Sequence, residues 1–396
     1  MKSGPGRNPA VPAAAGEKGR NGMKTVSYMT CQSRMERQFD RFGRQMPART
    51  ESPEAFWAWK KEAGTKLYEL LGLERMERCP LESQVTEVCE AEPGIRRERV
   101  VIQTEPDVWM PVYVLIPEQA EAKRRAGGRP SCVIAPAGHG SGGKISTAGD
   151  QSSVAAALGI RRYHCDYGLQ LARKGLVALC PDSRGFGERR EPAVQGDRPE
   201  QVLASSCRQL AHMAEPLGMT VAGMFVWDLM RLIDYIEERD QWNLEDIGCV
   251  GFSGGGMQTL FLTALDGRVA RACVSGYLYG YKDALLKLND NCSCNYVPGL
   301  WRYLDMGDIG AMIAPRPLVI QSCVEDPLNG ERGLENVREP MEVIRGAYAC
   351  LGAEDRLCHH ICPGGHQWHP EGADLFAAAW GEPPYTGWAP EVVKKA

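Results

Sequence analysis

Three segments in the first third of the chain alternate apolar and polar residues with a period of two, at 84–89, 96–103 and 110–116. This alternation is typical of β-strands with one covered face, and we predict antiparallel strands at the edge of a sheet. The preceding segment, 53–73, carries apolar residues at helical spacing. Ser52 and Pro53 suit the start of a helix and Gly72 suits its end, so we predict a helix there.

Beyond residue 130 the pattern changes to short apolar runs that alternate with longer amphipathic stretches. We predict strands at 132–135, 176–180, 247–250, 270–275, 318–321 and 359–362, and helices at 166–174, 219–238 and 257–265. Alternation of this kind implies right-handed crossovers and an α/β fold with a mostly parallel sheet, covered by helices on both faces. The charged, glycine-containing segment 120–130 is expected to be a surface loop.

The domain organisation follows from these elements. We predict one large domain over 84–396, with insertions at about 189–217 and 277–310 that shape a pocket above the strand ends. A helical extension over 23–83 precedes this domain. Residues 1–22 are rich in Gly, Pro, Ala and charge, so we expect a disordered tail there, with Met23 as an alternative start.

The segment 247–260 has the pattern of a buried strand, a very tight turn and a helix. At the turn, Gly251, Ser253 and Gly255 fit the G-x-S-x-G pattern of a nucleophile elbow. Glycines on both sides let strand and helix pass closely, and the helix directs free N–H groups at the serine. A glycine-rich turn that only connects strand to helix is the alternative, but the strand-turn-helix context favours the elbow.

A serine nucleophile needs a base, usually histidine, and a carboxylate that orients this base. In such a fold the order along the chain is serine, acid, histidine. Asp326 follows the predicted strand 318–321 and is the candidate acid, with Glu325 as the second choice and a surface turn acid as the alternative. His366 follows a glycine turn after the last predicted strand and is the candidate base. The other downstream histidines fit less well, with His359 and His360 inside the strand and His369 on the wrong face of the turn.

The oxyanion of an acyl-transfer intermediate needs two backbone donors. We predict Gly254, the residue after the serine, and His139 in the glycine-rich loop 135–143, with Gly140 as the second choice. The alternative for this loop is phosphate binding, because Lys144 follows its glycines. The Walker A spacing fails, and no helix start follows as a Rossmann motif would require, so we expect no cofactor.

Three other polar segments are assigned structural roles. Asp182 and Arg184, after the strand 176–180, are expected to form an ion pair that fixes the floor of the pocket. The runs 358–362 and 292–294 contain Cys and His, but neither has the paired C-x₂-C spacing of a zinc site, and adjacent strand residues point to opposite faces. We therefore expect buried free cysteines and no metal.

Net charge and cysteine content indicate which partners and which cellular compartment are favoured. The net charge of −4 makes a phosphate backbone an unfavourable partner, so Arg34, Arg37, Arg41 and Arg44 are expected to form a solvated helix face. The 15 cysteines, an odd number spread through the predicted elements, fit a reducing, cytoplasmic location better than a disulfide framework. No apolar run is long enough to span a membrane, and the N-terminus lacks the hydrophobic core of a signal peptide.

The chain resembles the α/β-hydrolase superfamily through its motifs at 138–140, 182–187, 251–255, 315–317, 326 and 365–366. Within the superfamily it looks like the acetyl xylan esterases and dienelactone hydrolase-like serine hydrolases. The resemblance implies that Ser253 is the nucleophile, Asp326 the orienting acid and His366 the base. It also implies that His139 and Gly254 supply the oxyanion N–H groups.

The resemblance covers 85–396, with two departures. Some dienelactone hydrolases have a cysteine nucleophile and a Glu in the front loop; this chain has a serine and lacks that Glu, which argues against their activity. The segment 289–300 is not explained by the predicted triad, and we expect it to form a wall of the pocket.

We therefore expect a serine carboxylic ester hydrolase that acts on a small ester, with an acetyl group on a sugar suggested by the resemblance alone. A peptidase or amidase, an acyltransferase, and a non-catalytic binding protein on the same scaffold are the alternatives. The expected partner is a small-molecule ester, with no nucleic acid and no membrane. Aromatic residues such as Trp57 and Trp59 would suit either an interface in a homo-oligomer or internal packing.

Overall fold

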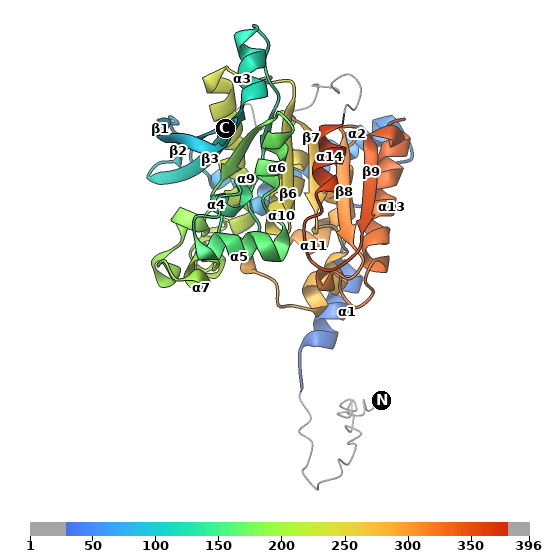
Figure 1. Ribbon diagram of the computed structural model, residues 1–396. Helices are drawn as coiled ribbons and strands as arrows, with labels where there is room; N and C mark the ends of the chain where they lie inside the picture. The colour runs from blue at the N-terminus through green and yellow to red at the C-terminus, as the bar shows by residue number, and fades with distance from the viewer. Residues whose placement is uncertain (1–28, 379–396) are drawn as a thin grey trace, which may run out of the picture.

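The computed structural model describes residues 29–378, which form one nine-stranded sheet with helices on both faces (Figure 1). The strands are β1 (Gln84–Glu92), β2 (Ile95–Glu105), β3 (Val108–Pro117), β4 (Cys132–Ile134), β5 (Val177–Pro181), β6 (Ile247–Phe252), β7 (Val269–Ser275), β8 (Leu318–Cys323) and β9 (Leu357–Cys362). The larger helices are α1 (Gln32–Phe42), α2 (Pro53–Leu71), α3 (Glu118–Arg125), α5 (Val154–Tyr163), α6 (Tyr167–Arg173), α8 (Cys207–Ala214), α9 (Val221–Arg239), α10 (Gly254–Leu265), α13 (Glu335–Cys350) and α14 (Glu371–Ala377). Short helices are α4 (Lys144–Thr147), α7 (Pro199–Val202), α11 (Leu300–Tyr303) and α12 (Met306–Ala311).

The sheet order is β1-β2-β3-β5-β4-β6-β7-β8-β9. The first three strands pair antiparallel with one another, and β3 pairs antiparallel with β5. From β5 to β9 all pairings are parallel. The predicted α/β fold, with a mostly parallel sheet and antiparallel N-terminal edge strands, is confirmed.

Both faces of the sheet are covered. Successive residues of a strand point to opposite faces, and on β7 Ala272 and Val274 lie in one apolar cluster while Cys273 lies in the other. Helices α9, α10 and α13 contribute to the first cluster, and α6 and α14 to the second (Figure 1). The parallel strands therefore consist of nearly continuous apolar residues, as burial on both faces requires.

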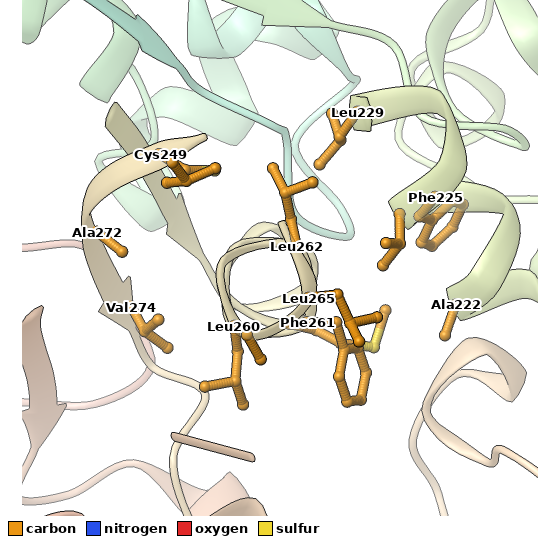
Figure 2. Packing of buried hydrophobic residues seen from close by; sticks show 14 of the residues in the cluster. Ala222, Phe225, Leu229, Cys249, Leu260, Phe261, Leu262, Leu265, Ala272 and Val274 are labelled. Carbon is orange, nitrogen blue, oxygen red and sulfur yellow. The ribbon is translucent and has the colours of Figure 1, made fainter. Parts of the chain in front are cut away.

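Helix α10, which follows the predicted elbow, lies wholly within the core. Every residue of α10 is buried. Figure 2 shows Leu260 on the side of Val274 of β7, and Leu265 on the side of α9, which carries Phe225. A helix composed mainly of glycine and apolar residues is suited to such a position, and the packing fixes the start of the helix relative to the sheet.

Helix α2 follows the prediction of a helix at 53–73 closely. Ser52 Oγ accepts a hydrogen bond from the Ala55 N–H at the start of α2, and Gly72 ends the helix with a φ of 73°. Trp59 is buried and its Nε1 donates to the Met46 carbonyl, so this aromatic residue packs internally. The predicted tail 1–22 lies outside the described residues.

The structure corrects the prediction of a loop at 120–130. Helix α3 occupies 118–125, with acidic residues in its first turn and basic residues in its last. This arrangement complements the helix dipole and stabilises an exposed helix that has only one buried residue, Ala120. The helices α5 and α13 were not predicted either, and α13 contains Pro340, a residue that normally argues against a helix interior.

The two predicted insertions contain helices and no strands. The segment 189–217 includes α7 and α8, and 277–310 includes α11 and α12. No single helix within residues 29–378 has the length and apolar character to cross a membrane; α8 with its continuation to Leu217 meets that criterion only together with α9, at a bend of 96°. Helix α9 is apolar because most of its residues are buried in the core.

Candidate active site

Ser253 lies at a sharp turn between β6 and α10. Its φ of 56° and ψ of −122° belong to a region that non-glycine residues rarely adopt, which is the strained geometry of a nucleophile elbow. A side chain at Gly251 would collide with the Gly255 carbonyl, and one at Gly255 would collide with the Pro136 carbonyl. The glycines of the motif are therefore required by the close approach of strand, helix and neighbouring loop.

The structure brings the predicted serine, histidine and aspartate together. His366 Nε2 lies 2.8 Å from Ser253 Oγ, and His366 Nδ1 lies 2.7 Å from Asp326 Oδ2. Asp326 is 3% exposed and comes from the loop after β8, whereas His366 comes from the loop after β9. Because β6, β8 and β9 are parallel, the loops at their carboxyl ends meet at one edge of the sheet.

The alternative residues considered for these roles lie elsewhere. Glu325 is exposed, and its side chain is not at the cavity that Ser253 lines. His359 Nε2 lies 3.2 Å from Ser322 Oγ, and burial lowers the pKa of His359 to about 4. His360 Nδ1 lies 3.3 Å from Gln321 Nε2, and His369 Nε2 lies 3.3 Å from Gln367 Nε2.

Aromatic rings hold the His366 imidazole in position. The ring centroid of Phe252, the residue before the serine, lies 4.6 Å from that of His366. The Tyr163 ring, at the end of α5, meets His366 edge-on with centroids 6.3 Å apart. These contacts limit rotation of the imidazole and keep both of its nitrogens aligned with their partners.

The glycine-rich loop after β4 lies against the start of α10. A Cβ atom at Gly254 would lie 3.5 Å from the backbone N of His139 and 2.5 Å from its Nδ1, so the two backbone segments lie close together. Tyr167 Oη donates to the Pro136 carbonyl, and Gln258 Nε2 donates to the Ala137 carbonyl at 3.2 Å. These bonds fix the loop in front of the elbow.

A cavity of about 630 Å³ opens at this point. Ser253, His366, His139, Gly140 and Gly254 line it. The volume is within the range of small-molecule sites. The predicted insertion at 277–310 contributes much of the remaining lining, namely Tyr277, Tyr279, Asp290, Asn291, Cys292 and Asn295.

Two tyrosines in this wall carry buried hydroxyl groups. The Oη atoms of Tyr277 and Tyr279 have no hydrogen-bond partner among the described residues, and the ring centroids lie 5.3 Å apart. Burial raises the pKa of both phenols well above the usual value, so both are neutral donors. A buried hydroxyl without a partner is unfavourable, and a bound polar ligand or water would satisfy it.

Comparisons with known proteins agree with this geometry. The profile of the Abhydrolase family matches residues 41–363. The chain belongs to the Abhydrolase family. The resemblance to the α/β hydrolases that the motifs indicated is thus confirmed.

A named relative of this abhydrolase shares little of its sequence. The Bacillus subtilis (strain 168) protein YtaP, which bears the name of a hydrolase, is 28% identical over 195 residues, which is 48% of this chain and 59% of YtaP. The chain thus matches less than two thirds of the length of this relative.

Solved structures share the fold of this abhydrolase at low identity. A Bacteroides fragilis NCTC 9343 protein titled an acetyl xylan esterase superimposes with a TM-score of 0.68 at 17% identity, covering 87% of this chain and 84% of the other. A glucuronoyl esterase from Solibacter usitatus gives a TM-score of 0.58 at 14% identity, covering 82% and 94%. At such identities the likeness establishes the α/β-hydrolase fold.

The floor of the site in this abhydrolase differs from the prediction. Asp182 does not pair with Arg184: its Oδ2 accepts from Lys144 Nζ at 2.7 Å, and both side chains are buried. Arg184 instead pairs with Asp228 of α9. The lysine is 38 residues from Asp182 in sequence, so local spacing could not reveal the pair. Because Lys144 is occupied in this way, its ammonium group does not extend into the cavity as a phosphate-binding lysine would.

Proposed function

We propose that this abhydrolase is a serine carboxylic ester hydrolase. The observation that carries the proposal is the continuous hydrogen-bonded series Asp326–His366–Ser253 at the cavity. Ser253 Oγ attacks the ester carbonyl carbon while His366 Nε2 takes the hydroxyl proton. Asp326 holds the Nδ1–H of His366 and stabilises the imidazolium that forms.

The remaining steps use the same residues. His366 returns its proton to the leaving alcohol as the carbon–oxygen bond breaks, which leaves an acyl group on Ser253. A water molecule then gives a proton to His366 and attacks the acyl carbon, and Ser253 leaves with that proton as the acid is released. The N–H groups of Gly254 and His139 are the proposed donors to the oxyanion, and each such donor typically contributes about 10²–10³ in rate.

We propose a small ester of a polar alcohol as the substrate. The unpartnered hydroxyls of Tyr277 and Tyr279, with the charged Arg162 and Asp290 at the cavity, favour a ligand rich in hydroxyl groups. Two structural neighbours bear the names acetyl xylan esterase and glucuronoyl esterase, so acetylated sugars and glucuronoyl esters are the first compounds to test.

The test is hydrolysis of p-nitrophenyl acetate by the wild type, by Ser253→Ala and by Ser152→Ala, an exposed serine that serves as the control. A fluorophosphonate label located by mass spectrometry accompanies the assay. We expect turnover by the wild type and the control, loss of turnover in Ser253→Ala, and the label on Ser253. A label on another residue, or full activity in Ser253→Ala, would contradict the proposal. A folded wild type that neither hydrolyses esters nor accepts the label would favour a non-catalytic binding protein.

An amidase or an acyltransferase would also begin with attack of Ser253 on the carbonyl carbon. They are separated by the acceptor and the leaving group: a p-nitroanilide substrate tests amide cleavage, and added alcohols or sugars test acyl transfer. Release of free acid at a rate equal to that of p-nitrophenol identifies hydrolysis.

A further inference from the structure

Four metal-ligating side chains from three separate segments meet beside the oxyanion loop. They are His139 of the loop after β4, Cys207 at the first residue of α8, and Cys292 and Cys294 around the short 3₁₀ helix Ser293–Asn295. Their ligand atoms all lie within 4.8 Å of one another. We propose that these four residues form a structural zinc site.

The distances suit one tetrahedral ion. His139 Nε2 lies 3.3 Å from Cys294 Sγ and 3.8 Å from Cys207 Sγ. A Zn²⁺ ion bound by sulfur at about 2.3 Å and nitrogen at about 2.0 Å separates neighbouring ligand atoms by about 3.5–3.8 Å. A shift of less than about 1 Å in the side chains would therefore complete the coordination, and the ligand set of three cysteines and one histidine is a standard one for structural zinc.

The surroundings supply further contacts to the sulfur atoms. Asn295 Nδ2 donates to Cys294 Sγ at 3.7 Å and to the Cys292 carbonyl at 3.0 Å. Ser205 Oγ lies 3.9 Å from Cys292 Sγ. Hydrogen bonds to ligating sulfurs orient the ligands and moderate the charge of thiolates, as outer contacts do in known metal sites. Cys207 and Cys294 are buried, whereas His139 and Cys292 are half-buried and line the cavity, so the ion would lie in the wall of the cavity.

The position and the number of the ligands indicate a structural role for the ion. Four protein ligands fill a tetrahedral shell, which is the arrangement of structural rather than catalytic zinc. The ion would join the two insertions, 189–217 and 277–310, to the oxyanion loop, three segments that come from distant parts of the sequence. Coordination through Nε2 would also fix the His139 ring, whose Nδ1 faces Gly254.

This site revises the expectation of no metal. Spacing along the chain does not reveal the site, because Cys292-x-Cys294 is closer than the usual C-x₂-C pair. Cys207 and His139 are 85 or more residues away from this pair in the chain, so only the fold brings them together.

Metal analysis of the purified full-length protein tests the proposal without reference to esterase activity. We expect roughly one zinc ion per chain in the wild type and in Cys165→Ser, and loss of the ion in Cys207→Ser and Cys294→Ser. Cys165 is a matched control because it is as buried as Cys294, each being 2% exposed, but lies outside the cluster.

A second measurement uses the wild type alone, in case a variant fails to fold. After chelation under reducing conditions, addition of Co²⁺ should restore one equivalent of bound metal, with thiolate-to-cobalt charge transfer and the intense visible bands of a tetrahedral ion. Chelation should also lower the unfolding temperature and expose three additional reactive thiols. Absence of these bands, equal metal content in the wild type and both cluster variants, or a disulfide among Cys207, Cys292 and Cys294 in freshly isolated protein would overturn the proposal.

Discussion

Asp326 contacts both the imidazole of His366 and the backbone of its own turn. Its Oδ2 lies 2.7 Å from His366 Nδ1, while its Oδ1 accepts a hydrogen bond of 2.9 Å from the Leu328 N–H. One carboxylate therefore begins the short helix at Pro327–Asn329 and orients the proposed base. Because the turn fixes the carboxylate, the histidine is aligned with the serine before any substrate binds.

Replacing the Asp326 carboxylate by an amide should distinguish the effect of its contact with His366 from that of its contact with the Leu328 N–H. Asp326→Asn retains an oxygen for Leu328 N–H but can no longer hold the imidazole in the required tautomer, so we expect kcat to fall by about 10⁴ with little loss of stability. We expect a similar fall in kcat for Asp326→Ala and, in addition, a loss of about 1 kcal/mol of stability because the contact with the turn is removed. Ester hydrolysis and urea unfolding of both variants measure these effects. A kcat for Asp326→Asn within tenfold of the wild type would show that Asp326 does not orient the base.

The glycines of the elbow offer a test of packing. A methyl group at Gly255 would collide with the Pro136 carbonyl, which belongs to backbone and cannot move aside easily. We expect Gly255→Ala to destabilise the fold by about 1–3 kcal/mol, as measured by urea unfolding. Gly365→Ala is the matched control, because a Cβ there would meet only the Glu325 carbonyl, at 3.8 Å. Equal effects of the two substitutions would contradict the packing argument.

A buried acid beneath the site should give the stability a specific pH dependence. Burial acts to raise the pKa of Asp228, but the charges of Arg184 and Arg189 outweigh it and lower the pKa from 3.8 to about 2. A pKa that is lower in the folded state than in the unfolded chain gives a stabilisation that is fully present above pH 3.8 and is lost as the pH falls through about 2. The shift corresponds to about 2 kcal/mol.

Substitution of Asp228 should remove this dependence. Denaturation of Asp228→Asn between pH 6 and pH 2.5 is expected to show a smaller loss of stability on acidification than the wild type, from a lower starting value because Arg184 and Arg189 lose a partner. The control is Asp197→Asn, which removes an exposed carboxylate and should leave the profile unchanged. If stability fell with pH to the same extent in the wild type and in Asp228→Asn, Asp228 would not be the source of the pH dependence.

The sequence alone was sufficient to predict those site residues that follow a predicted strand. Ser253, Asp326 and His366 each lie within a few residues of the carboxyl end of a strand, so the parallel order of the sheet predicted their meeting without knowledge of side-chain positions. Periodicity also located the strands, because burial on one or both faces leaves a pattern in each of them. The helix α3 was missed because its glycine-containing surroundings and lack of an apolar stripe are typical of a loop.

Contacts between distant segments could not be predicted in the same way. The partner of Asp182 is Lys144, the first residue of α4, although Arg184 is only two residues away in sequence and equally able to form an ion pair. The cluster of His139, Cys207 and Cys294 depends on how two insertions fold over the oxyanion loop. Insertions have neither a periodic pattern nor a fixed place in the sheet, so their mutual contacts become visible only in the folded chain.

The Lys144–Asp182 pair provides the sharpest test of the pocket floor. The side chains are 2% and 0% exposed, and Asp182 also accepts hydrogen bonds from the Lys144 N–H at 2.8 Å and the Glu188 N–H at 3.0 Å. Removal of one member leaves the other charge buried, so Lys144→Met should cost about 3–5 kcal/mol.

A double-mutant cycle separates the ion pair from simple loss of packing. Asp182→Asn keeps the shape and an acceptor oxygen, and combined with Lys144→Met it removes both charges, so the double variant should be more stable than the sum of the single effects predicts. The expected coupling is at least about 1 kcal/mol by urea unfolding. Because the pair joins the oxyanion loop to the loop after β5, kcat should fall in the same order as stability. Additive single effects would mean that each side chain acts through its own packing, and that the floor is not held by the pair.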